Sequence, residues 1–545
     1  MKQLLDIKKL SFYITVSPKF ENILKNEIKR IFKSNSLLIP KFGKKEAGSV
    51  SFEVGIDTDY YNTTTPTTTT TTQKQTNSTL QQVTSRGEGH NRDSENTIKN
   101  DAHHTSLGVI SKYLWSLSSC TRLAESIRIR ISDRINCRNF NELEQSLSAV
   151  PWLEFFPSST EVPLISVSCT KSKLYHSNAV KERIQKYFQH HVLPEIRQYQ
   201  VSVASKHRKK LKKQLRKLSV TSSVDPDVAL ENSQTGPEIE VQPPQTKLYV
   251  RLDEDQLQLT IDATSVDNVM LHKRIQNKHV TEAPIRETLA YAALSLAQVV
   301  SPHNQNSFWD AFMGSGGILQ EAVSCVSTSS EGKVLPNSQN TGTRVFQYQY
   351  FPWHLSEQFN EYQQNLKPKI PTKRVNNRFF IGSDISDRAL DSTRFNLTQE
   401  GYQPKTMPSD DSNDIESVIT DDDYLLLQSG DFQKVYKNIE LISKRYQTPF
   451  TILSNLPYGH RILHQDPKHQ TMKISDKLVD LFKRFGTMLK NSDESVLKHV
   501  YVINGNPKFK ELTGVKWIEI ESFKNGGIDV QLLQFQRESK DTTSN

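Results

Sequence analysis

From residue 281 to residue 535 the chain alternates between two hydrophobic periodicities, and this alternation most constrains its fold. Short apolar runs, typical of buried strands, take turns with longer segments that carry a helical apolar stripe. Such an alternation predicts an α/β domain with a doubly wound, mostly parallel sheet. The predicted strands are 307–312, 379–386, 425–432, 449–455, 499–505 and 530–535. Residues 281–300 are predicted to form one long helix, with Pro284 in its first turn.

The first half of the chain has a different, α+β pattern. Segments 11–16, 48–54, 125–131 and 164–170 resemble strands, and segments 20–32, 109–120, 140–152 and 178–188 resemble helices. Residues 247–263 alternate through a predicted hairpin whose turn is at DEDQ. We therefore expect a separate region before the predicted parallel sheet.

Three polar segments interrupt these patterns and are predicted to be loops or linkers, because they bury too little apolar surface to offset the entropy of ordering. They are 57–106, 199–245 and 402–423. The predicted organisation is an α+β region at 1–198, a linker or insert at 199–245, a connecting hairpin segment at 246–280 and the α/β domain at 281–540.

Polar residues follow the predicted strands at the edge where ligands bind in such sheets. Asp310 precedes the turn Gly314-Ser315-Gly316 and a helix, and glycines let a backbone pass close to a ligand. Asp384 follows the next strand, where a carboxylate can accept hydrogen bonds from a ribose; a helix N-cap is the alternative. Asp431 follows the third strand and could accept from an adenine amino group; an ordinary turn is the alternative.

The segment SNLPYG (454–459) raises a similar question, because a strand followed by a turn would also explain it. The Asn455 side-chain oxygen and the Leu456 carbonyl could each accept one N–H of a planar amino group. That would orient a weakly nucleophilic amine by position and electrostatics. Tyr458 could stack on the base, and Pro457 would stiffen the loop. A base must leave its stack to reach such a pocket.

Together, the glycine turn, the two acidic strand ends and the N-x-P-Y loop resemble a class I methyltransferase that binds S-adenosylmethionine. Four segments carry a more specific resemblance, to THUMP-domain RNA guanine-N2 methyltransferases, closest to the bacterial 23S ribosomal RNA group. They are 271–294, 310–322, 380–397 and 454–462. Segments 11–54, 109–131 and 150–188 resemble the ferredoxin-like and THUMP RNA-binding region of that family.

The resemblance implies a Rossmann-like methyltransferase domain and S-adenosyl-L-methionine as cofactor. It places Asp310, Gly314, Ser315 and Gly316 at the methionine side of the cofactor, Asp384 at the ribose and Asp431 at the adenine. Asn455, Leu456, Pro457 and Tyr458 would form the target-amine loop. The sequence differs from the family pattern at Ala311, Met313, Gly317 and Leu456. Residues 346–361 are expected to form additional structure in the long gap between Asp310 and Asp384.

The net charge of +9 permits a nucleic-acid partner without requiring one. Lys273, Arg274 and Arg461 are predicted to line the path of the RNA, with surface ion pairing as the alternative. The basic block 206–217 could contact phosphates, direct nuclear import or be a solvated charge run. We expect an RNA partner, ribosomal by resemblance, and a monomer.

The sequence also leads to expectations about metals, membrane spans and cellular location. The four cysteines form no CxxC pair and no zinc pattern, so reduced thiols and no metal are expected. No apolar run is long enough to span a membrane. An intracellular location is expected, in the cytoplasm, nucleus or nucleolus, with the mitochondrion left open.

Several activities remain compatible with these residues. The expected one is methylation of guanosine N2 in large-subunit ribosomal RNA. Adenine N6 is a second target, because N-L-P-Y also occurs in ribosomal RNA adenine dimethyltransferases, and transfer RNA guanine N2 is a third. A non-catalytic RNA-binding assembly factor is the alternative from another class. A protein glutamine methyltransferase shares the N-x-P-Y chemistry but has no use for a THUMP-like region.

Overall fold

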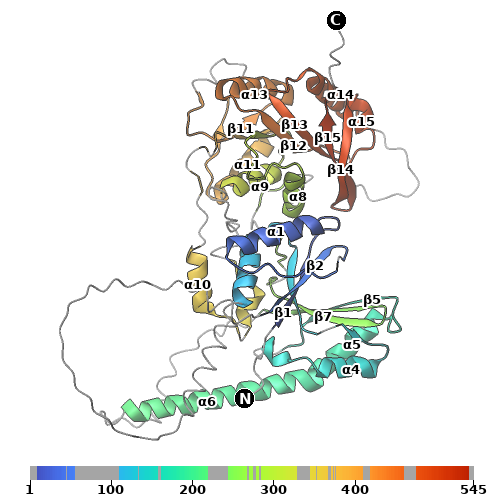
Figure 1. Ribbon diagram of the computed structural model, residues 1–545, viewed down its shortest axis with the longest axis vertical. Helices are drawn as coiled ribbons and strands as arrows, with labels where there is room; N and C mark the ends of the chain where they lie inside the picture. The colour runs from blue at the N-terminus through green and yellow to red at the C-terminus, as the bar shows by residue number, and fades with distance from the viewer. Residues whose placement is uncertain are drawn as a thin grey trace, which may run out of the picture.

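The computed structural model places two units along its long axis, each built on its own sheet (Figure 1). The N-terminal unit comprises the sheet β1–β7 and its helices, and the C-terminal unit comprises the sheet β8–β15 and its helices. The described residues are 9–44, 46–55, 110–132, 134–156, 161–218, 244–266, 269–273, 278–281, 284–327, 344–351, 353–365, 370–371, 374, 376–408, 418–459 and 474–538. The predicted insert 57–106 lies outside them.

The N-terminal sheet has the order β2-β1-β3-β7-β6-β5, with β4 paired to β7. Its strands are β1 (Lys9–Thr15), β2 (Ser49–Gly55), β3 (Ser126–Arg130), β4 (Ile135–Asn136), β5 (Leu164–Thr170), β6 (Lys247–Asp253) and β7 (Gln256–Asp262). Only the β5–β6 pair is parallel among the described pairs. Leu248, Val250 and Leu252 of β6 alternate into the core, as the predicted hairpin requires. The hairpin lies inside this sheet, whereas the sequence predicted it to be a connection between domains.

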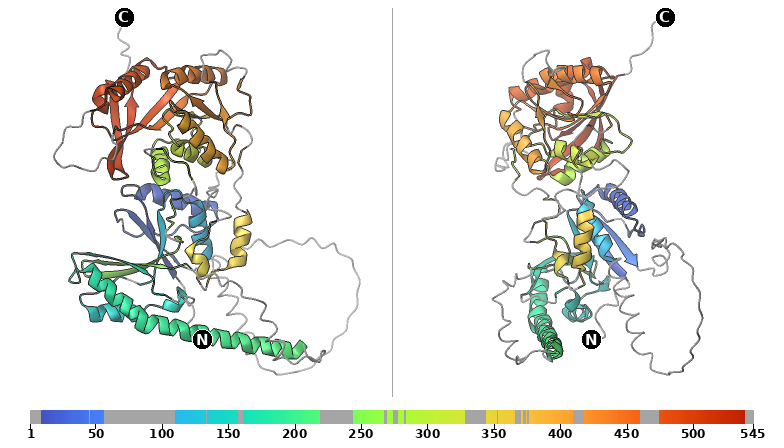
Figure 2. Two further views of the ribbon diagram at one scale, coloured as in Figure 1. Left: turned by 180° about the vertical axis from the view of Figure 1, so that it is seen from behind. Right: turned by 90° about the vertical axis from the view of Figure 1, so that its left-hand side faces the viewer.

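Helices cover this sheet with the faces that their periodicity predicts. They are α1 (Glu21–Ser34), residues 110–120, α4 (Phe140–Ser148), α5 (Ser177–Tyr187) and α6 (Leu193–Leu218), with a 3-10 turn at Trp152–Glu154 and a π-helical turn at Phe188–Val192. The α1 stripe of Leu24, Ile28, Ile31 and Phe32 is buried. Helix α6 continues through the basic block, so residues 199–218 are helical where a linker was predicted. It extends well beyond the sheet (Figures 1 and 2).

The C-terminal sheet confirms the predicted doubly wound α/β fold. Its order is β10-β11-β9-β8-β12-β13-β15-β14. The strands are β8 (Ser307–Asp310), β9 (Phe380–Asp384), β10 (Lys405–Thr406), β11 (Leu425–Ser429), β12 (Phe450–Asn455), β13 (Leu497–Asn504), β14 (Lys516–Asn525) and β15 (Ile528–Gln536). All pairs up to β13 are parallel, and β15 and β14 close the edge as an antiparallel hairpin. The sequence patterns did not predict β14, and β10 lies in segment 402–423, which was predicted to be a loop. The chain reverses its direction of winding between β8 and β12.

The helices of this unit are α8 (Glu287–Leu296), α9 (Gly317–Ser327), α10 (Ser356–Asn365), α11 (Asp387–Gln399), α13 (Phe432–Tyr446), α14 (Asp476–Asn491) and α15 (Phe509–Thr513). The single helix predicted at 281–300 was wrong in its bounds. Arg286 is extended, with ψ of 141°, and forms the N-cap, so Pro284 lies before the helix. The helix ends at Leu296, with Ala297 as its C-cap, which leaves α8 half the predicted length.

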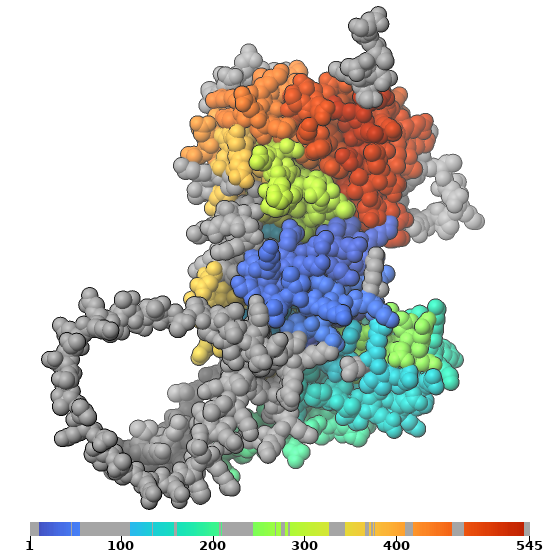
Figure 3. All heavy atoms as spheres, viewed as in Figure 1, coloured from blue at the N-terminus to red at the C-terminus, as the bar shows by residue number. Residues whose placement is uncertain are grey.

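Both units share an interface with buried polar contacts. Arg122 of the N-terminal unit donates to Glu321 of α9 at 3.0 Å, and both side chains are 7% exposed. Arg30 donates to the Tyr291 hydroxyl of α8 at 3.0 Å. The space-filling view shows the blue N-terminal segment directly against the green surface of α8 and α9 (Figure 3). These contacts fix the position of one sheet relative to the other.

The predicted additional structure between Asp310 and Asp384 strengthens this interface. It contains a 3-10 turn, Gln347–Tyr350, followed by α10, which lies beside the N-terminal unit (Figure 1). The hydroxyls of Tyr348 and Ser118 are 3.0 Å apart, and the rings of Trp115 and Phe359 are 5.4 Å apart. This insertion therefore binds the C-terminal unit to the N-terminal one.

Candidate active site

Asp310 and the Asn455 loop lie close together between β8 and β12, where the winding of the chain through the sheet reverses. Asp310 ends β8 and Asn455 ends β12, and these strands are parallel neighbours. Ser454 joins them, because its hydroxyl accepts from the Ala311 N–H at 2.8 Å and donates to the Asp310 carboxyl. The sequence patterns did not single out Ser454, since a serine inside an apolar strand has no distinguishing local signal.

Asp310 is almost fully buried, at 1% exposure, and this burial raises the pKa of its carboxyl to about 7. Hydrogen bonds from Ser454 and from the Phe312 backbone oppose the rise in pKa, while Asp384 adds to it. A cationic group bound beside Asp310 would favour its ionised form. S-adenosylmethionine carries such groups on its methionine side, so this carboxyl fits the cofactor.

The glycine turn between β8 and α9 has the backbone conformation that its residues permit. Gly314 and Gly316 have φ of 54° and 80°, in the left-handed region. A Cβ on Gly316 would lie 2.6 Å from Thr393 Cγ2. The turn therefore depends on glycine at this position for both its conformation and its close approach to α11.

Two side chains of α11 hold this turn from behind, and the sequence patterns missed both. Thr393 donates to the Gly314 carbonyl at 2.9 Å, and Asn396 donates to the Ser315 carbonyl at 2.9 Å. Asn396 also exchanges hydrogen bonds with the backbone of His279. Their spacing of three residues on one helix face was the available signal.

Asp384 lies at the end of β9, beside the glycine turn. One carboxylate oxygen accepts from the Gly314 N–H at 3.0 Å and the other from the Ser386 N–H at 3.0 Å. A carboxylate has about four lone-pair sites, so two of them remain for a ribose. The alternative role of Asp384 as the N-cap of α11 is wrong, because Ser386 is the N-cap and, at this helix, Asp384 accepts only from the backbone N–H of that cap residue.

Asp431 lies at the end of the neighbouring strand and has structural partners. It caps α13 by accepting from the Gln433 N–H at 3.0 Å, and it pairs with Arg484 of α14 at 2.7 Å. Strand β11 places Ser429 opposite Asp384 in register, so Asp431 lies at the same edge of the sheet. Binding of adenine by Asp431 remains a prediction.

The Asn-Leu-Pro-Tyr loop leaves β12 at this edge. The Leu456 side chain is buried, and its N–H donates to the Ile503 carbonyl of β13. Pro457 is exposed, and the Tyr458 hydroxyl donates to Oδ1 of Asn455. The Tyr458 ring is 6% exposed and lies against Gly505, where an added Cβ would be 3.1 Å from its Cγ. The ring therefore does not face open space, and its stacking on a base stays a prediction.

The predicted RNA-contacting residues are only partly placed. Lys273 is exposed, and its carbonyl accepts from Arg344 at 3.2 Å. Arg274 and Arg461 lie outside the described residues, so their predicted role is not tested here.

Cysteine chemistry, metal binding and membrane spans find no support in the described part of the chain. All four cysteines are free, and Cys120 and Cys137 are buried. Within the same residues no cluster of three His, Cys, Asp or Glu side chains is arranged to hold a metal ion. None of the described helices has the length and apolar composition needed to cross a membrane.

A doubly wound sheet that carries a glycine turn, a buried carboxylate and an Asn-Leu-Pro-Tyr loop at one edge has the architecture of class I methyltransferases. Residues 274–424 match the family described as UPF0020, RMKL-like methyltransferase domain. These residues therefore match a methyltransferase domain. The chain belongs to the same family as a putative uncharacterized protein of Dictyostelium discoideum, with 31% identity over 96% of this chain and 99% of that protein.

More distant similarities extend this relationship. The chain is 23% identical to the ribosomal RNA large subunit methyltransferase K/L of Hydrogenovibrio crunogenus, over 58% of this chain. It spans only 37% of that relative's length. The solved structure of SMU.472, a putative methyltransferase complexed with SAH, superposes with a TM-score of 0.52 at 18% identity and covers 97% of this chain and 99% of that one. At this identity the superposition shows a shared fold.

Proposed function

We propose that this protein transfers a methyl group from S-adenosylmethionine to the exocyclic N2 amine of a guanosine in RNA, and that the RNA is large-subunit ribosomal RNA. One observation carries the proposal. Asn455 leaves β12 beside the strand that ends in Asp310, so the amine-accepting loop and the cofactor turn share one edge of the sheet.

The chemistry asks little of the protein beyond positioning. A bound cofactor supplies an electrophilic methyl group, and the purine amine must direct its lone pair at it. The Asn455 side-chain oxygen and the Leu456 carbonyl would each accept a hydrogen bond from one amine N–H and so fix the direction of the lone pair. Asp310 and the turn at Gly314 and Gly316 would hold the methionine side of the cofactor, with Asp384 at the ribose and Asp431 at the adenine.

The proposal of an RNA substrate rests on two further considerations. A similar protein carries the name of a ribosomal RNA large subunit methyltransferase. We also propose that the N-terminal unit is a ferredoxin-like and THUMP RNA-binding region, as the sequence resemblance implies. Its fixed attachment through Arg122 and Glu321 would present RNA at a constant distance from Asn455.

A direct test is mass spectrometry of nucleosides from RNA of cells that lack the protein, combined with methylation of that RNA by the purified enzyme. We expect loss of one N2-methylguanosine and its restoration in vitro. An N6-methyladenosine product would move the target to adenine. Calorimetry that detects no S-adenosylmethionine binding would favour a non-catalytic RNA-binding factor and overturn the proposal.

A further inference from the structure

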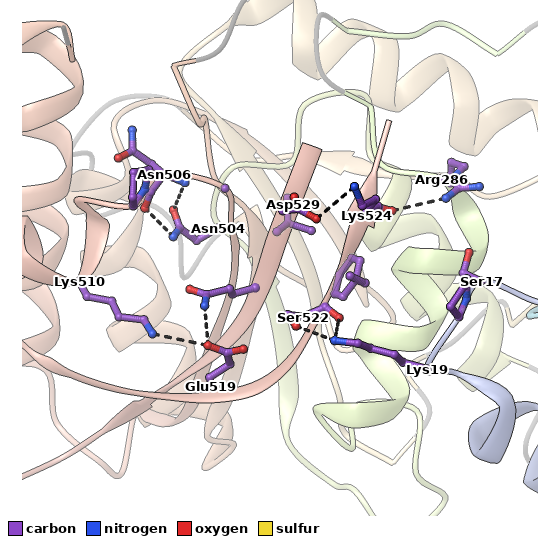
Figure 4. Close-up of a pocket in the computed structure, with 16 residues that line it drawn as sticks. Ser17, Lys19, Arg286, Asn504, Asn506, Lys510, Glu519, Ser522, Lys524 and Asp529 are labelled. Atoms are coloured by element: carbon purple, nitrogen blue, oxygen red, sulfur yellow. Dashed lines mark hydrogen bonds and ion pairs between the residues drawn. The ribbon is translucent and has the colours of Figure 1, made fainter. Parts of the chain in front are cut away.

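A cavity of about 800 Å³ lies where the two units meet (Figure 4). One wall is the turn Ser17–Lys19 of the N-terminal unit, and another is the hairpin of β14 and β15. The floor is the segment Asn504–Pro507, which continues from the carboxyl end of β13. Neither unit alone encloses this space. A volume of this size is within the range of about 300–1,000 Å³ typical of ligand sites.

The cavity adjoins the proposed amine loop. Its floor residue Asn506 donates from its side chain to the Tyr458 carbonyl at 3.0 Å. Gly505 lies directly under the Tyr458 ring. Tyr458 in turn donates to Asn455, so this loop separates the cavity from the amine-accepting oxygen. A nucleotide in the cavity would therefore be close in space to a base held at Asn455.

Four cations from four different elements line the cavity, against two carboxylates. Lys510 of α15 lies at one end of the hairpin, and Lys19 and Arg286 lie at the other, with Lys524 of β14 nearby (Figure 4). The lining formally carries an excess of positive charge, as a site for a polyanion requires.

These cations divide into structural and exchangeable ones. Lys19 donates to the Ser522 carbonyl at 2.7 Å and Arg286 donates to the Glu125 carboxylate at 3.3 Å, so both hold the two units together. By contrast, Lys510 and Lys524 form long, exposed ion pairs, with Glu519 at 3.9 Å and with Asp529 at 3.6 Å respectively. Exposed pairs of this kind contribute little and exchange readily with another anion.

We propose that this cavity binds the sugar-phosphate backbone of the nucleotides adjacent to the target base, with phosphates on Lys510 and Lys524. The proposal rests on the proposed function, since the identity of the polyanion as RNA comes from the neighbouring amine loop. Because both units line this cavity, RNA bound by the N-terminal unit would continue through it to the target base at Asn455.

The test compares two double variants with the same loss of charge. In Lys510→Ala/Lys524→Ala both cavity cations are removed. In the control, Lys444→Ala/Lys498→Ala, two exposed lysines are removed from the end of α13 and the start of β13, at the opposite edge of the sheet. The probe is a fluorescein-labelled, single-stranded RNA of mixed sequence, titrated at several KCl concentrations. An unchanged Tm confirms that each variant folds.

We expect the cavity variant to bind the RNA about ten-fold more weakly, with a salt slope lower by about 1.4, because each phosphate contact on a single strand contributes about 0.7. The control should match the wild type, and S-adenosylmethionine affinity should be unchanged in both variants. Equal salt slopes in the cavity variant and the control would overturn the proposal. Competition by poly-glutamate as strong as that by RNA of equal charge would overturn its assignment to RNA.

The two proposals fail separately in this design. If the wild-type enzyme methylates RNA while the cavity variant keeps the wild-type salt slope, the proposed function stands and the proposal that the cavity binds RNA is wrong. If the cavity variant loses RNA binding while the wild type transfers no methyl group to RNA, the proposal that the cavity binds RNA stands and the proposed reaction is wrong.

Discussion

The Tyr458 hydroxyl donates a hydrogen bond to Oδ1 of Asn455, the oxygen proposed to accept the substrate amine. Burial raises the pKa of Tyr458, against an opposing hydrogen bond from Asn525, so the phenol stays a neutral donor at physiological pH. A donor on Oδ1 fixes which end of the amide faces the loop. The contact therefore selects one of the two flip states of Asn455.

Replacing Tyr458 with Phe should lower kcat about ten-fold, or about 1.4 kcal/mol, because the amide can then present its NH₂ group to the substrate. Steady-state methylation of RNA would measure this effect, and cofactor affinity should not change. Tyr424→Phe, which removes a hydroxyl bonded to the Pro371 carbonyl at the other end of the sheet, is the control. In an Asn455→Asp background the loss should vanish, since both carboxylate oxygens accept; an equal loss there would contradict flip control.

Replacing Asn455 with Ala should abolish methyl transfer while leaving S-adenosylmethionine affinity nearly unchanged. The side chain would contact the substrate amine and not the cofactor, so its removal acts on the transition state. Single-turnover transfer and calorimetry on the same preparation would separate the two effects. Turnover at the wild-type rate would exclude Asn455 from the mechanism.

Cofactor affinity should depend on pH through Asp310. Burial raises the pKa of this carboxyl to about 7, and the cationic methionine end of the cofactor favours its anion. The dissociation constant should therefore fall as pH rises from about 6 to about 8, and then level. Asp310→Asn should bind more weakly and without this pH dependence. Calorimetry at several pH values would measure it, and a parallel pH profile in the variant would assign the titration elsewhere.

The same carboxyl predicts a trend in stability. Because the folded-state pKa lies above the unfolded one, the contribution of Asp310 to folding is fully present below about pH 4 and is lost as pH rises to about 7. Asp310→Asn should therefore gain in Tm relative to the wild type between pH 5 and pH 8, by thermal denaturation without cofactor.

Replacing Gly316 with Ala should cost about 2–4 kcal/mol, from the strained left-handed backbone and the clash with Thr393. The matched variant is Gly526→Ala, where φ is 57° and no described atom lies within 4 Å of the added Cβ. It should cost only about 1–2 kcal/mol of backbone strain. Urea denaturation would compare them, and only Gly316→Ala should weaken cofactor binding. Equal costs would mean that the contact with Thr393 relaxes freely.

Removing one member of the buried Arg122–Glu321 pair should destabilise the protein by about 3–5 kcal/mol, because it leaves the other charge buried. The double variant Arg122→Met/Glu321→Leu should recover most of this loss. Breaking the exposed pair of Lys498 and Glu494 by Glu494→Ala should cost about 0–1 kcal/mol. Urea denaturation would measure all three, and a small effect of Arg122→Ala would show that water reaches Glu321.

The sequence by itself determined the features that depend on local periodicity. The apolar runs located six of the C-terminal strands, and their alternation with helices predicted a mostly parallel sheet, in which five of the six are parallel. The apolar stripe of α1 identified its buried face at Leu24, Ile28 and Ile31. Glycine at 314 and 316 indicated a turn that other residues adopt at a cost, and both have positive φ. Asp310, Asp384 and Asn455 could be assigned to strand ends because each directly follows an apolar run.

Only the tertiary structure decided which of these strand ends meet. The contact between Ala311 and Ser454 spans 143 positions in the sequence, and no local pattern encodes that β8 pairs with β12. The same holds for the grip of Asn396 on the glycine turn, for the Tyr458 hydroxyl on Asn455 and for the cavity between Lys19 and β14. A strand's periodicity specifies that it has a buried face, whereas its partner is chosen by how all the apolar faces of the chain pack together, and polar contacts between distant segments follow from that choice.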